Sequence, residues 1–105
     1  MYARNVSLKL KPNSAPEFVR LIEKEIIPLL RKQKGFQDEI SFVSAERNEA
    51  MAISFWDKQD DAQFYNHVAY LDVLKVLSRV VETMPIIKTF EVANSTSHRI
   101  AARCV

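Results

Sequence analysis

The chain is predicted to be one α+β domain of the ferredoxin-like type, with a four-stranded antiparallel sheet and two helices on one face in the order β-α-β-β-α-β. Three observations predict it. The chain has 105 residues, enough for a single hydrophobic core. Four segments alternate apolar and polar residues, and the two stretches between them carry apolar residues at helical spacing. One glycine and four prolines leave little sequence for long loops.

A strand and a capped helix open the predicted domain. Residues 5–10 alternate apolar and polar side chains with the two-residue period of a strand. Ser14 and Glu17 then form a capping-box pattern, in which the hydroxyl accepts from the Glu17 N–H and the carboxylate reaches back. From residue 18 to residue 30 the apolar side chains recur at the spacing of an amphipathic helix.

A kinked helix and a hairpin are expected next. Pro28 lacks a backbone donor, so the helix should kink near Lys24. A basic last turn and Gly35 indicate the end of this helix. Residues 36–44 and 50–56 alternate as strands, and the short polar segment between them favours a hairpin.

A second helical region and a last strand complete the pattern. Asp57 is the predicted N-cap of a helix, and a second helical piece covers residues 71–81. Residues 86–92 alternate as the fourth strand. We therefore assign residues 1–94 to the domain and residues 95–105 to a C-terminal tail.

The predicted strands are apolar on both faces. Ile53 and Phe55 lie on one face, and Ala52 and Trp56 on the other. Helices on one side only would leave the other face uncovered, and a second copy is the simplest cover, so we expect a homodimer. Burying several hundred Å² per subunit at ~25 cal/mol/Å² gives on the order of 10 kcal/mol before association costs. The alternative is a monomer whose exposed face is merely mixed.

Charge and cysteine content restrict the partners and the location. The chain has 15 Lys and Arg against 13 Asp and Glu, a net charge of +2. These charges are mixed, and the basic cluster at 31–34 is interpreted as a helix end, so no nucleic-acid partner is expected. Cys104 is the only cysteine, which excludes an intrachain disulfide and favours a reducing compartment. Residues 1–5 show no signal peptide, and the apolar runs are too short to cross a membrane, so a cytoplasmic location is expected.

Three segments resemble the antibiotic biosynthesis monooxygenase-type domains. They are residues 53–65, where Phe55-Trp56 leads into an acidic helix start, residues 26–36, which step through Gly35-Phe36 into a strand, and the closing residues 89–92. The resemblance covers about residues 3–93, and it implies a dimeric α+β barrel.

The resemblance implies a cofactor-independent monooxygenase that acts on an aromatic or quinol-like small molecule. Such a reaction uses no metal or flavin, because the substrate anion itself passes an electron to O₂. The protein supplies a dry pocket, donors for the anion and a base. The alternative is a non-catalytic dimeric module that binds a small molecule or serves only as structure. An enzyme should have a cavity of at least ~300 Å³ between its helices and sheet.

The candidate catalytic residues are Asn5, Tyr65 and His67. Asn5 can hold a substrate oxygen, Tyr65 can donate to a bound oxygen and His67 can act as a base. Each has a simpler interpretation: a polar strand residue, a buried tyrosine bonded to backbone, and a surface histidine. No paired histidines or cysteines indicate a metal site. The residues expected to line the substrate pocket are Trp56, Phe64 and Tyr70. For Trp56, a position in the core or in an interface is the commoner case.

A haem-degrading branch of the resembling family has an Asn, a Trp and a His as its signature. Asn5 stands at the Asn position, whereas Tyr65 and Lys75 stand at the Trp and His positions. Two of the three residues are absent, so haem degradation is not expected. His67 is the residue that could coordinate a haem if the helix were shifted.

Overall fold

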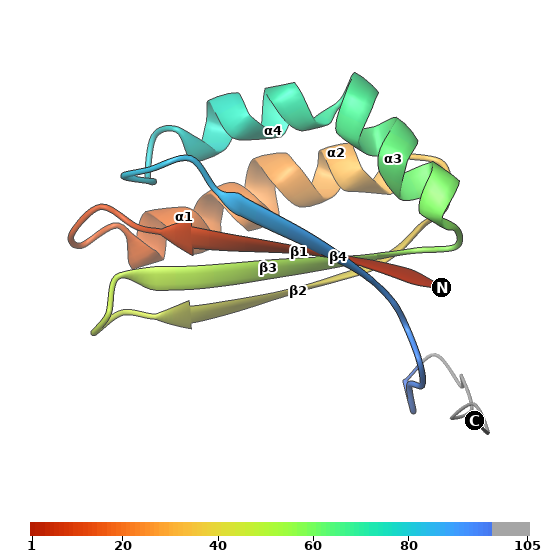
Figure 1. The fold of residues 1–105 in the computed structure, drawn as a ribbon. Coiled ribbons are helices and arrows are strands. Elements are labelled where there is room, and N and C mark those ends of the chain that lie inside the picture. Colours follow the sequence, from red (N-terminus) through yellow and green to blue (C-terminus); the bar gives the residue numbers. More distant parts are fainter. Residues whose placement is uncertain (98–105) are drawn as a thin grey trace.

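The computed structural model describes residues 1–97, which form a four-stranded antiparallel sheet with all helices on one face (Figure 1). The sheet order is β2-β3-β1-β4, which confirms the ferredoxin-like prediction. Cys104 and His98 lie outside the described residues. The strands are β1 (Tyr2–Lys9), β2 (Phe36–Ser44), β3 (Glu49–Trp56) and β4 (Ile86–Glu91). The helices are α1 (Ala15–Leu21), the π-helical turn η1 (Ile22–Ile26), α2 (Ile27–Arg31), α3 (Gln59–Val68) and α4 (Tyr70–Leu77).

The core lies between the helices and the central strand β1. Alternate β1 residues face the helices, and Val6 and Leu8 are buried there. Phe18 and Leu21 are fully buried against them from α1. This face of the sheet therefore has its cover within a single chain.

The first helical region has its irregularity at the predicted place. Pro28 cannot donate to the carbonyl of Lys24, and the chain widens into the π-helical turn η1, which is centred on Lys24. The capping-box prediction is wrong. Ser14 makes no side-chain cap, and the Glu17 carboxylate instead accepts two hydrogen bonds from Arg20, at 2.6 and 2.9 Å.

The second helical region is divided in two. The residue between α3 and α4 is Ala69, whose φ of −128° and ψ of −24° end the first helix and begin the second. The N-cap position belongs to Lys58 rather than Asp57, because the Asp57 carboxylate accepts a hydrogen bond from the side chain of Gln37. None of the helices within residues 1–97 is long and apolar enough to cross a membrane.

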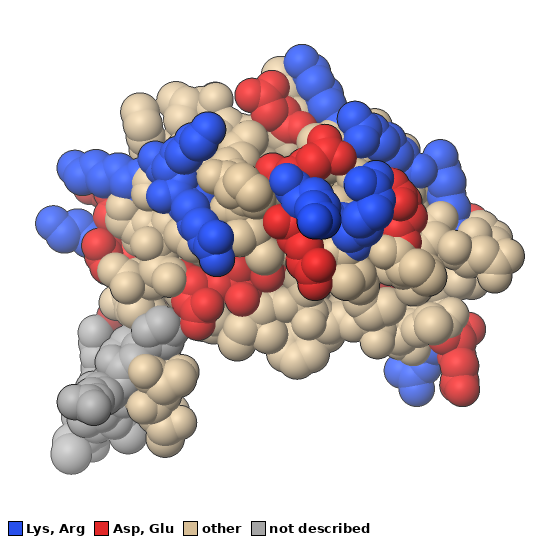
Figure 2. Space-filling view, turned by 180° about the vertical axis from the view of Figure 1, so that it is seen from behind, with Lys and Arg blue, Asp and Glu red and all other residues tan. Residues whose placement is uncertain are grey.

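The other face of the sheet, hereafter the open face, has no helix over it (Figure 1). Figure 2 shows most of the charged side chains over the helix layer, whereas the middle of the lower rim, where the sheet lies, is uncharged. The register brings apolar side chains of all four strands onto the open face, and several are half exposed. They include Ile40, Phe42, Met51, Ile86 and Phe90, of which Phe42 is 54% exposed and Phe90 53% exposed.

Gly35 permits the close approach of the β2 start to α3. Its φ is +79°, in the left-handed region, and its carbonyl accepts from the Asp57 N–H at 2.8 Å. A methyl group added at Gly35 would lie 2.7 Å from the Cβ of Asp61, closer than real carbon atoms approach.

We therefore expect Gly35→Ala to lower the free energy of unfolding by about 2 kcal/mol, from the left-handed backbone and from the displaced Asp61. Urea denaturation measures the change. Asn48→Gly is the matched control, because Asn48 also has a positive φ, of 53°, and glycine relieves it. Equal stability of Gly35→Ala and the parent chain would contradict this assignment.

Candidate functional site

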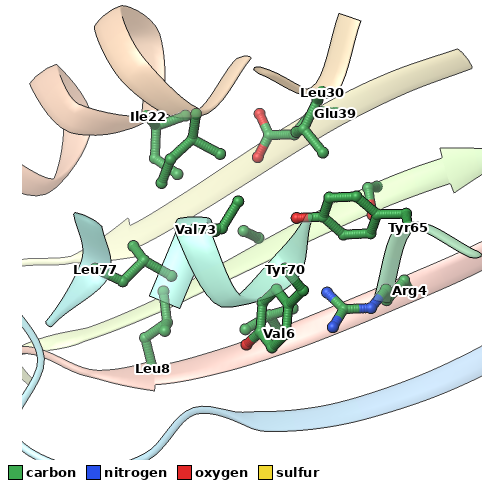
Figure 3. A pocket seen from close by; sticks show the side chains of 13 residues that line it. Arg4, Val6, Leu8, Ile22, Leu30, Glu39, Tyr65, Tyr70, Val73 and Leu77 are labelled. Carbon is green, nitrogen blue, oxygen red and sulfur yellow. The ribbon is translucent and has the colours of Figure 1, made fainter. Parts of the chain in front are cut away.

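A small cavity, hereafter the inner void, lies between the helices and the sheet (Figure 3). The volume that the centre of a water molecule can occupy in it is about 30 Å³. A water needs ~10–15 Å³ by this measure, so the void has room for about two waters. It is far smaller than the ~300 Å³ expected for an aromatic substrate. Most of its wall is aliphatic, and the polar side chains that reach it are Arg4, Glu39, Ser54, Tyr65 and Tyr70.

Three aromatic rings pack in sequence beside the void. Trp56 is fully buried, and its indole N–H donates to the Ser54 hydroxyl at 2.9 Å. Tyr65 stacks on Trp56 with 4.9 Å between ring centroids, and Tyr70 lies 6.1 Å further along. Trp56 is thus a core residue that fixes the position of Tyr65.

Arg4 is a buried cation at the edge of this aromatic cluster. Its side chain comes from β1 and the residue is only 3% exposed. One terminal nitrogen donates to the amide oxygen of Asn66 at 2.8 Å. The guanidinium lies 4.0 Å from the ring centroid of Tyr70 and 5.2 Å from that of Tyr65, within cation–π range.

Both tyrosines remain protonated donors at neutral pH. Burial raises the pKa of Tyr65 well above its usual range, and the charge of Arg4 only partly opposes the rise. Burial also raises the pKa of Tyr70, whose hydroxyl is buried without a hydrogen-bond partner of normal geometry. The Tyr65 hydroxyl points into the inner void (Figure 3).

Glu39 brings a carboxylate from β2 to the wall of the inner void. Burial raises the pKa of this carboxyl group, and a hydrogen bond from the Ser41 hydroxyl, 2.5 Å long, partly offsets the rise. The carboxyl group is therefore partly removed from water, in surroundings where electrostatic interactions are stronger than in bulk water.

An open depression, hereafter the outer cleft, lies between α3 and the strands β1 and β4. Its volume on the same measure is about 350 Å³, within the range of small-molecule sites. Arg4 lines both the outer cleft and the inner void, so it stands at the boundary between them. The remaining polar lining includes Tyr2, Gln59, Gln63, Asn66, His67 and Thr89.

The predicted catalytic residues do not surround one cavity. Tyr65 lines the inner void and His67 lines the outer cleft. Asn5 pairs with Ile53 and Lys88 on the open face, because its neighbours Arg4 and Val6 point towards the helices. The Asn5 amide oxygen is buried there without a hydrogen-bond partner.

The predicted pocket residues are likewise divided. Tyr70 lines the inner void, Trp56 supports it from the core, and Phe64 is 60% exposed on the outer side of α3. Sequence reasoning missed Arg4. Strand alternation places residues 4, 6 and 8 on one face, so a cation on the same face as two core residues could have been noticed. Asn66 and Glu39 carried no such signal, since their neighbours come from other elements.

The residues at the positions of the haem-degrading signature also lie on different parts of the molecule. Lys75 is exposed and forms an ion pair with Asp72 at 4.0 Å, whereas Asn5 lies on the open face. Within residues 1–97, no three His, Cys, Asp or Glu side chains lie close enough together to hold a metal ion.

Comparisons with known proteins identify the fold. No protein-family model and no curated protein matches the chain. Among solved structures, a monooxygenase from the ActVA-Orf6 gene of Streptomyces coelicolor in complex with nanaomycin D matches with a TM-score of 0.75 at 13% identity, over 90% of this chain and 88% of that one. SnoaB, a cofactor-independent oxygenase from Streptomyces nogalater, matches with a TM-score of 0.71 at 12% identity, over 90% and 95%.

A third match has no known role. The NE2512 protein of unknown function from Nitrosomonas europaea gives a TM-score of 0.73 at 14% identity, over 90% of this chain and 91% of that one. Further matching structures are described as antibiotic biosynthesis monooxygenases. The chain therefore has the fold of the antibiotic biosynthesis monooxygenase-type domains.

Proposed function

We propose that the chain is a cofactor-independent monooxygenase that acts on an aromatic or quinol-like small molecule. The observation that carries this proposal is the pair of adjoining spaces: an outer cleft large enough for an aromatic substrate, and an apolar inner void large enough for dioxygen. Dioxygen is small and apolar, so a void with room for about two waters suits it.

The chemistry needs only the substrate and dioxygen. A ring methylene between two aromatic rings, as in an anthrone, loses two hydrogens and gains one oxygen to become a carbonyl. The second oxygen leaves as water with those two hydrogens. The substrate supplies all four electrons that reduce O₂, so the reaction balances without an external reductant.

The described side chains provide roles for this reaction. His67, in the outer cleft, accepts the proton that leaves the substrate. The Tyr65 hydroxyl donates to the reduced oxygen that forms in the inner void, and its high pKa keeps that proton available. Trp56 and Tyr70 hold the Tyr65 ring in place. Asn5 is left out of this site because it belongs to the open face.

A non-catalytic module is the second candidate, and one observation favours it. The space between the helices and the sheet is filled mainly by aliphatic side chains, as a purely structural domain requires. This alternative predicts ligand binding, or no ligand at all, without oxygen uptake.

We also propose that the chain forms a homodimer through its open face. The half-exposed apolar side chains of Phe42, Ile86 and Phe90 share this face with a single strand lysine between them, Lys88, whereas most of the charged residues in view lie on the helix layer. A two-fold pairing of such faces removes apolar area from water on both copies at once.

Oxygen uptake with an anthrone tests the oxygenase. We expect uptake above the protein-free rate, and a loss of about 100-fold in kcat for Tyr65→Phe, because one donor to the developing charge is removed. Ser78→Ala is the matched control, since it removes a hydroxyl from the exposed end of α4. Uptake equal to the protein-free rate would favour the non-catalytic module, and full activity in Tyr65→Phe would contradict the role of Tyr65.

The pH dependence of stability tests whether the Glu39 carboxyl group is removed from water. Because burial raises the carboxyl pKa in the folded state, the favourable contribution of protonated Glu39 is present at acidic pH and is lost as pH rises through the folded pKa. Glu39→Gln should therefore be more stable than the parent chain at pH 7, and this gain should shrink at pH 4. Urea denaturation at both pH values measures it. A gain that does not depend on pH would show that the carboxylate is fully hydrated.

Sedimentation velocity tests the dimer. We expect a particle of twice the 12.1 kDa chain mass at micromolar concentration. Phe42→Asp should shift it to the monomer, because a charge on the open face would be buried unpaired. Leu71→Asp is the matched control, as Leu71 is 66% exposed on the helix layer and its change should leave the dimer intact. A parent chain that sediments as a monomer would overturn the proposal.

A further inference from the structure

Arg4 carries a buried charge that no carboxylate of the described residues neutralises. The ion pairs within residues 1–97 join Arg20 to Glu17, Lys75 to Asp72 and Arg79 to Glu25, all on the surface. The partners of Arg4 are instead an uncharged amide and the faces of two tyrosine rings. A buried cation without a counter-charge is costly, because it loses its hydration and gains only partial compensation.

The geometry of the guanidinium leaves donors for a ligand. A guanidinium has five N–H donors in a planar fork. Arg4 uses one nitrogen to bind the Asn66 oxygen, and its side chain also interacts with the Tyr70 hydroxyl, so further donors remain. Tyr70, with its centroid 4.0 Å from the guanidinium carbon, covers the group from one side (Figure 3). Arg4 also lines the outer cleft, together with Asn66.

The outer cleft has the properties of an anion site for a flat molecule. No Asp or Glu is among its lining residues, and Arg4 and His67 are the groups in it that can carry a positive charge. The amide and hydroxyl groups of Gln59, Gln63 and Thr89 are neutral hydrogen-bonding partners on its wall. A planar fork prefers a planar, two-oxygen or delocalised oxyanion over a compact one.

We propose that Arg4 binds the oxyanion of a flat aromatic ligand, an aromatic carboxylate or a phenolate, which enters through the outer cleft and takes the place of the Asn66 amide oxygen on the guanidinium. The inference deepens the proposed function by naming the substrate class, and it rests on the same cleft. It does not depend on oxygenation, since a non-catalytic module with this site would bind the same ligands.

The test uses two probes of the same shape and different charge, 2-naphthoate and 2-naphthamide. Binding is measured by calorimetry and by the fluorescence of Trp56, the only tryptophan of the chain, which stacks on Tyr65 next to Arg4. We expect naphthoate to bind at least about tenfold more tightly than naphthamide, which is the usual advantage of a charge-assisted hydrogen bond. Equal affinities, or no binding of either probe at millimolar concentration, would overturn the proposal.

Three variants locate the anion. Arg4→Met keeps the length of the side chain without its charge and should remove the preference for naphthoate. Arg4→Lys keeps the charge but not the fork, so it should retain a part of the preference, and it serves if Arg4→Met does not fold. Asn66→Ala should leave the naphthoate affinity unchanged or raise it, because the ligand replaces that amide. An unchanged preference in Arg4→Met, or a large loss in Asn66→Ala, would contradict this arrangement.

A control and a third probe complete the experiment. Arg20→Met removes an arginine that is paired with Glu17 on the surface, and it should leave the affinity ratio unchanged. A nitrophenol, whose phenolate absorbs visible light, distinguishes the two oxyanions. Increased phenolate absorbance on binding at fixed pH assigns the site to phenolates as well as to carboxylates. If the absorbance does not increase, the site is limited to carboxylates. A chain that binds naphthoate but shows no oxygen uptake with an anthrone would refute the oxygenase alone. Anthrone-dependent uptake that Arg4→Met does not change would refute the role of Arg4 alone.

Discussion

The two-residue alternation of side chains along β1 determines which residues reach the core and the candidate site and which reach the open face. β1 lies inside the sheet, paired with β3 on one side and β4 on the other, so both of its faces matter. Residues 4, 6 and 8 face the helices and form the floor of the core, while residues 3, 5 and 7 face away from them. A shift of one residue in register would move Arg4 to the open face and Asn5 into the core.

The architecture was predictable from the sequence, and its details were predictable only in part. Alternation located all four strands, and the bounds of β2 are those expected, because apolar spacing is a property of the segment itself. Capping was not predictable in the same way. Glu17 and Asp57 each had a better partner than the helix N-terminus, in Arg20 and Gln37, and Gln37 is 20 residues away along the chain.

The site shows the same limit more strongly. Tyr65 was expected beside the sheet and lies there, since its position follows from helical spacing. Asn5 was expected with it as a donor, because it stands at the Asn position of the haem-degrading branch of the resembling family, but strand alternation sends Asn5 to the opposite face. The Arg4–Asn66 contact joins residues 62 positions apart, and only the folded chain brings them together.

The sheet has two outer strands, and their edges bear on how copies of this chain meet. Within residues 1–97, β2 pairs only with β3 and β4 only with β1, so each presents a row of backbone donors and acceptors to its surroundings. A register shift between Phe36 and Asp38 bends the start of β2, and Lys88 places a charge in the middle of β4. Such irregularities and charges discourage edge-to-edge strand addition. Edge-to-edge growth has no natural end, whereas the proposed face-to-face pairing closes after two copies, so edges that resist strand addition favour the closed assembly.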